Sequence, residues 1–135
     1  MYEPIRTPSV HRMAAEPGVP HRSRDEELDI RLAGHLTALL TVTDELRAVS
    51  PGEDLDRAAE RIAELVTRLN RGRAPLRAAP SGDSVHHPFP LHQRARTLAG
   101  NALSVATARD NVTAMELSTE RMEAHAAALD LTTAA

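Results

Sequence analysis

The chain of 135 residues contains no cysteine, no tryptophan and no lysine, and Tyr2 and Phe89 are its only tyrosine and phenylalanine. Without cysteine it can form neither a disulfide framework nor a cysteine-based zinc site. Without lysine, Schiff-base catalysis and the phosphate-binding loop lysine are excluded as well. All 16 positive side chains are arginines, a bias typical of high-GC coding, and we therefore expect a bacterial source.

Large apolar side chains are also scarce. Leucine, isoleucine, valine and phenylalanine total 28 residues, whereas alanine alone supplies 23. No apolar run approaches the roughly 20 residues of a membrane-spanning helix, and the first 25 residues carry prolines and arginines where a signal peptide needs an apolar stretch. We therefore expect a cytoplasmic protein with no membrane partner. The dominance of leucine and alanine over β-branched residues favours an all-α fold in one small domain.

The first predicted element is a helical hairpin over residues 23–71, which follows a flexible arm at 1–22. Ser23 and Glu26 form a capping-box pattern at its start. Apolar residues then follow three- and four-residue spacing, with a second flank beside the main stripe. The main stripe consists of Leu28, Leu32, Leu39, Val42, Leu46 and Val49, and the flank of Ile30, Ala33, Leu36 and Leu40.

The turn of this hairpin is predicted at Ser50. Ser50 and Glu53 match a second capping box, and Pro51 occupies a position favoured at the start of a helix. A tight turn predicts two antiparallel neighbours. Gly72 is expected to end the second helix in a left-handed conformation.

A basic loop containing proline and histidine is predicted at 72–90, followed by a helical pattern over 91–131 and a tail at 132–135. This helical pattern runs for forty residues without a proline, and it is compatible with two structures. The segment either breaks near Asp110 into two helices, or it remains one helix of about 60 Å and pairs with a second copy. Both alternatives give a small helical bundle, and we expect dimerisation to complete it. The predicted association seam consists of Leu98, Val105, Val112, Met115 and Met122.

Charge is unevenly distributed along the chain. Residues 24–67 carry a net charge of −6, whereas residues 68–96 carry +5. Arginine presents a planar fork that suits phosphate or carboxylate. The candidates for binding an anion are therefore Arg71, Arg73, Arg77, Arg94 and Arg96. The alternative is that these arginines pair with the acidic helices of the same or a neighbouring subunit.

The histidines offer less specific patterns. His86, His87 and His92 could contribute to a metal site, but their spacing matches no established ligand pattern. We therefore predict no metal site and no cofactor. His35 and His125 fall among apolar residues of helices and are interpreted as structural.

The sequence contains no recognisable catalytic constellation. We therefore expect a non-enzymatic, self-associating accessory or structural protein that mediates protein-protein interaction. The alternative is a ligand-binding protein or small enzyme that uses the arginine- and histidine-rich loop on an anionic metabolite. Nucleic-acid binding is the least favoured hypothesis, because neither interleaved aromatics nor a helix-turn-helix pattern is present.

Overall fold

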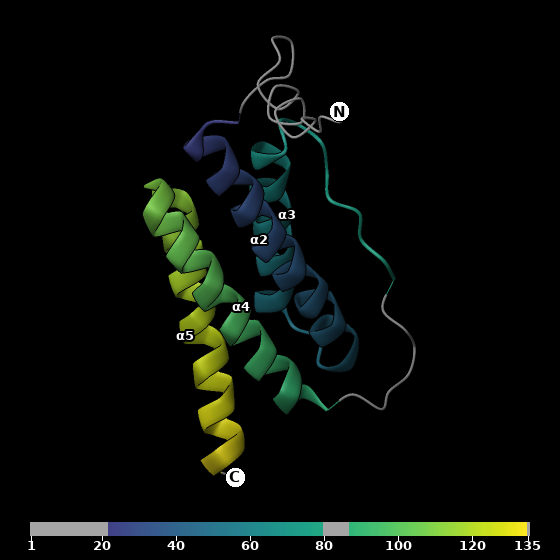
Figure 1. Cartoon of the computed structure of the whole chain (residues 1–135). Coiled ribbons are helices and arrows are strands. Elements are labelled where there is room, and N and C mark those ends of the chain that lie inside the picture. Colours follow the sequence, from purple (N-terminus) through teal and green to yellow (C-terminus); the bar gives the residue numbers. More distant parts are fainter. Residues whose placement is uncertain (1–21, 80–86, 135) are drawn as a thin grey trace, which may run out of the picture.

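Four α-helices form an all-α bundle in the computed structural model, which describes residues 22–79 and 87–134 (Figure 1). They are α2 (Arg24–Val49), α3 (Glu53–Leu69), α4 (Pro88–Arg109) and α5 (Val112–Ala134). Helix α2 packs against both α3 and α4, and α5 packs mainly against α4. Helices α3 and α5 make few contacts with each other, so the bundle is loosely packed along that edge. The predicted fold class is confirmed, whereas the arm at 1–21 lies outside the described residues.

The start of α2 follows the predicted capping box. The backbone N–H of Glu26 donates to Ser23 Oγ at 3.1 Å, and the N–H of Ser23 donates to Glu26 Oε1 at 3.0 Å. The second predicted capping box is wrong. Gly52 is the residue before α3 and no side chain caps that helix, while the N–H of Ser50 bonds to Leu46 O at the end of α2. Because Ser50 closes one helix, it stands too early in the chain to cap the next.

The end of α3 forms a Schellman motif. The N–H of Gly72 donates to Thr67 O at 2.8 Å and that of Arg71 to Arg68 O at 3.1 Å. Both Arg71 (φ 57°) and Gly72 (φ 95°) adopt left-handed conformations. The predicted role of Gly72 is therefore confirmed, and it is shared with an arginine that bears the strain of a positive φ.

Two residues separate α4 from α5, so the long C-terminal pattern is a broken helix pair. Asp110 adopts a left-handed conformation (φ 61°), and the N–H of Asn111 bonds back to Ala106 O at 2.9 Å. Asn111 then caps the next helix, because its Oδ1 accepts from the N–H of Ala114 at 3.0 Å. The chain reverses here into an antiparallel hairpin (Figure 1).

Two helix ends differ from the predicted boundaries. Helix α4 begins at Pro88, three residues earlier than expected, because prolines are tolerated in a first turn whose N–H groups have no partner within the helix. Helix α5 continues to Ala134, through most of the predicted tail.

The core consists of the leucines of α2 against small residues of α4. Leu32, Leu36, Leu39, Leu40 and Leu46 are completely buried, and so are the alanines of α4 at 95, 99, 102 and 106. Alanines allow two helix axes to approach closely, which explains how so few large side chains can fill a core. The predicted second flank of α2 is partly wrong, because Ile30 is 53% exposed.

Helix α5 buries a face different from the one that the sequence pattern favoured. The predicted seam continued through Val112, Met115 and Met122, yet Val112 is exposed and the methionines are only half-buried. The break at Asp110 shifts the helical phase, so the stripe of α4 does not continue into α5. The buried face of α5 instead contains Ala114, Leu117, Ser118, Arg121, His125 and Leu129.

Candidate functional site

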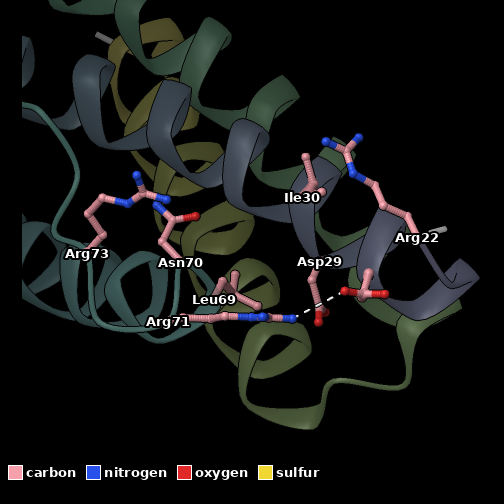
Figure 2. Close-up of a pocket in the computed structure, with 8 residues that line it drawn as sticks. Arg22, Asp29, Ile30, Leu69, Asn70, Arg71 and Arg73 are labelled. Atoms are coloured by element: carbon pink, nitrogen blue, oxygen red, sulfur yellow. Dashed lines mark hydrogen bonds and ion pairs between the residues drawn. The ribbon is translucent and has the colours of Figure 1, made fainter. Parts of the chain in front are cut away.

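The arginines predicted to bind an anion do not form one site. Arg71 and Arg73 lie where α3 ends, beside the first turns of α2, and they line a pocket with Arg22, Glu26 and Asp29 (Figure 2). The guanidinium groups in this pocket point in different directions rather than toward a common centre. This arrangement gives no convergent anion cradle.

Two of these arginines pair with acidic residues of α2. Arg71 Nη2 lies 3.2 Å from Glu26 Oε2, the contact dashed in Figure 2. Arg77 forms a bidentate pair with Asp44, with Nε at 3.0 Å and Nη2 at 2.6 Å from the two carboxylate oxygens. Asp44 also accepts from Arg47 Nη1 at 3.1 Å. The alternative prediction, neutralisation by the acidic helices of the same chain, is therefore confirmed for Arg71 and Arg77.

The Arg77 pair fastens the connection after α3 to the side of α2. Burial raises the pKa of Asp44, but the hydrogen bonds from Arg77 and Arg47 outweigh this effect and hold that pKa below its usual value. The same carboxylate raises the pKa of Arg77. The segment is thus fixed by a charged clamp and not by apolar packing, since Leu76 beside it is 95% exposed.

Arg94 and Arg96 lie near the start of α4, which is at the opposite end of the bundle from the end of α3 (Figure 1). Both side chains are exposed, and neither forms an ion pair with any described residue. The five candidate arginines therefore fall into three separate places: the end of α3, the side of α2 and the first half of α4.

The predicted metal candidates are also dispersed. His86 lies outside the described residues, and His87 is an exposed residue directly before α4. His92 is half-buried and pairs with His125 of α5, with 2.9 Å between the two Nδ1 atoms. In the described ranges no group of three or more histidine, aspartate or glutamate side chains is arranged to hold a metal ion.

His92 and His125 belong to a polar cluster that joins three helices. Arg121 is 1% exposed, and its Nη1 lies 3.1 Å from Asp54 Oδ2 in the first turn of α3. Its Nη2 lies 3.5 Å from His125 Nε2. If Arg121 donates there, the proton of His125 resides on Nδ1 and donates to His92 Nδ1, which satisfies both contacts.

Both histidines are held in the neutral form. Burial and the neighbouring Arg121 lower the pKa of His125 to about 3, and the same causes lower the pKa of His92. A cation bound between the rings would face the buried guanidinium, so the cluster is poorly suited to a metal. Ser118 Oγ and Arg121 Nε are buried and have no hydrogen-bond partner among the described residues.

The residues of the predicted association seam divide between two sides of the α4–α5 hairpin. Val105 is buried within the chain, and Leu98, seven residues earlier on the same face, packs against the core. That face continues to Arg109, whose Nε lies 2.9 Å from Asp29 Oδ1 of α2. These residues are therefore occupied by contacts within the monomer.

The other seam residues border an uncovered groove. Val112 is 60% exposed, and it lines a shallow, open groove with Met115 of α5 and Leu103 of α4. We call this surface the α5 groove. Its remaining lining residues are Glu116, Thr119, Glu120 and Glu123. Met122 continues the apolar strip, and its Cε lies 3.6 Å from the position that a Cβ atom on Gly100 would occupy.

Comparisons with protein families, curated proteins and solved structures find no match. In the described part of the chain, no helix is long and apolar enough to cross a membrane.

Sequence reasoning missed the polar cluster. Arg121 and Ser118 are polar types that an apolar pattern assigns to the surface, and Asp54 resembled an ordinary first-turn acid. One signal was present: Arg121 and His125 are four residues apart and lie among alanines and Leu117, which places both on the face opposite the exposed acids of α5.

Proposed function

We propose that the protein is a non-enzymatic interaction module that associates through the α5 groove. The observation that supports this proposal is the groove lined by Leu103, Val112 and Met115, in which Val112 is exposed and the other two side chains are half-buried. Val112 is one of only three large hydrophobic side chains exposed in the described residues, the others being Ile30 and Leu76. Exposed apolar strips with polar borders are typical of interaction surfaces.

The opposite face of α5 favours the same interpretation. Arg121 and His125 connect α5 to α3 and α4, so the helix is held in one rotational orientation. The exposed Val112 is consequently presented outward by a fixed helix. Methionine adds an adaptable contact surface, because its unbranched side chain fits irregular partners.

The partner class we favour is a second copy of the chain, and the test is a solution mass. Light scattering of the wild-type protein should give a mass above that of the monomer, and Val112→Asp should return it to the monomer. Val112 begins α5, where an acid suits the helix dipole, so circular dichroism should remain helical.

A matched control adds the same charge beside the groove. Thr113 is exposed and does not line it, so Thr113→Asp should keep the wild-type mass. A wild-type protein that is monomeric at all accessible concentrations would contradict self-association. Val105→Asp cannot serve here, because that side chain is buried within the monomer and its loss should unfold the chain.

A further inference from the structure

We infer that Leu76 of one chain inserts into the α5 groove of the next, so that copies of the protein associate head to tail. This inference rests on the proposed function and names the surface of the second copy that the groove binds. It follows from the charges that line the groove and from the way in which residues 73–77 are fixed to the bundle. We call these residues the Leu76 segment.

The charges of the α5 groove disfavour a contact between two grooves. Glu116, Glu120 and Glu123 all line it, and no basic residue does. Glu120 pairs with Arg61, whereas the other two form no ion pair with a described residue. Two grooves in contact would bring these carboxylates together, and like charges across an interface weaken association. The complementary surface therefore combines an apolar side chain with positive charge.

Two large apolar side chains outside the groove are exposed in the described part of the chain, and only one of them projects. Ile30 is 53% exposed and lines a hollow of the surface with Leu69. Leu76 is 95% exposed. Because the α5 groove is itself a hollow, a side chain that fills it has to project from the partner. Shape thus favours Leu76 over Ile30.

The charge around Leu76 is complementary to that of the groove. Residues 71–79 contain three arginines and no acid. Two of these arginines pair with Glu26 and Asp44 of α2. The third, Arg73, is exposed and forms no ion pair with a described residue. A free guanidinium group three residues before Leu76 can therefore face the acids of the groove when the leucine is inserted.

Both ends of the Leu76 segment are fixed to the bundle. At the first end, the N–H of Arg73 donates to Asn70 O at 3.3 Å, just after α3. At the other end, Arg77 forms its bidentate pair with Asp44. Leu76 thus projects from a segment that is already held in place. Binding then orders little additional chain, which reduces the entropy lost on association.

The Leu76 segment and the α5 groove lie on opposite sides of the molecule. In Figure 1 the connection after α3 runs along the right of the bundle, whereas α5 lies on the left. Leu76 therefore cannot reach the groove of its own chain, and one copy cannot make both contacts with the same neighbour. A heterologous contact of this kind produces a ring or an open chain of subunits, not a two-fold dimer.

Substitution of Leu76 tests this contact, because so exposed a side chain contributes little to the fold. Leu76→Asp removes the apolar contact and places a carboxylate against an acidic groove. It should weaken self-association at least about tenfold. Ile30→Asp is the matched control, since it replaces an exposed side chain of the same size with the same charge elsewhere. This variant should keep the wild-type mass, and circular dichroism checks that both variants remain helical.

A mixture of two variants distinguishes a head-to-tail contact from a symmetric one. Leu76→Asp retains an intact groove, and Val112→Asp retains an intact Leu76. Each should be a monomer alone at concentrations where the wild type assembles. Together they can form one contact and no more, so an equimolar mixture should give a species of twice the monomer mass and nothing larger. Sedimentation velocity measures all the samples.

The results separate the two proposals. If Leu76→Asp assembles like the wild type while Val112→Asp is a monomer, the groove mediates association but Leu76 does not occupy it. If both variants are monomers alone and remain monomers when mixed, the head-to-tail contact is also wrong. Loss of assembly in Ile30→Asp would show that the effect is not specific to Leu76 and would overturn the inference. A monomeric wild type would remove both proposals.

Discussion

Arg121 Nη1 lies 3.1 Å from Asp54 Oδ2, yet Arg121 is 1% exposed and the Asp54 side chain 66%. The cation is thus fully buried, while its carboxylate partner stands at the surface of α3. Burying a charge costs desolvation free energy, and the ion pair with Asp54 and the hydrogen bonds of Arg121 offset this cost. The pair also provides one of the few contacts between α3 and α5.

Removing the carboxylate should destabilise the protein more than replacing the whole pair. We expect Asp54→Ala to lower the free energy of unfolding by about 1–2 kcal/mol, below the usual loss for a buried pair because Asp54 is largely solvated. The double variant Asp54→Ala with Arg121→Met should regain much of this loss, since no buried charge remains. Urea denaturation measures both. Additive losses in the double variant would contradict the interpretation.

Acid should weaken the fold through His92 and His125. Their pKa values lie below 6.5 in the folded state, so the unfolded chain binds protons first as the pH falls. Stability is therefore fully present above pH 6.5 and decreases as the pH falls below it, with a limit of about 1.4 kcal/mol per pH unit for each histidine. For His125 the decrease continues toward pH 3.

The window between about pH 6.5 and 5 isolates this effect. Glu26 and Asp44, whose pKa values are lowered, lose their contribution only as the pH falls through the acid range below it. His125→Phe should flatten the dependence of the melting temperature on pH in this window. His87→Gln, which removes an exposed histidine, is the control and should leave the slope unchanged.

The Arg77–Asp44 clamp should protect the connection after α3 from proteolysis. In Asp44→Asn the bidentate ion pair is lost, so the segment at 73–79 should leave α2 more often. We expect trypsin to cleave after Arg73 and Arg77 several-fold faster than in the wild type. Glu53→Gln, which removes a long surface ion pair of α3, should not change that rate.

Substitutions at the two residues of the turn between α4 and α5 should change the stability of the protein in opposite directions. Asp110 has a positive φ, so Asp110→Gly should keep or raise stability by up to about 1 kcal/mol. Asn111→Ala removes the cap on the Ala114 N–H and should cost about 1 kcal/mol. Thermal unfolding monitored by circular dichroism distinguishes the two. If both variants lost the same amount of stability, the left-handed conformation of Asp110 would not be a source of strain.

The helices themselves were largely predictable from sequence. Periodicity and the capping box at Ser23 gave α2, and Gly72 marked the end of α3. The break at Asp110 could be named as an alternative but not chosen, because a cap-like asparagine also occurs in continuous helices. Only the tertiary structure decides whether the chain reverses there.

The candidate site was less predictable, because it depends on helical phase and on pairing between helices. A two-residue turn shifts the phase of α5, so Val105 and Val112 share a sequence stripe but lie in different environments. Likewise, Arg77 and Arg96 belong to one basic stretch, yet Asp44 neutralises only the first. Sequence composition cannot distinguish an arginine with a partner 33 residues away from one without.

The short turns of the two hairpins also have a kinetic consequence. Three residues join α2 to α3 and two join α4 to α5, so each hairpin forms contacts between segments close in sequence. Such contacts form quickly because little chain must be ordered to close them. Docking of α4 on α2 has the longer separation, so the Arg109–Asp29 pair is expected to form after both hairpins. The two halves of the chain would then behave as successive folding units.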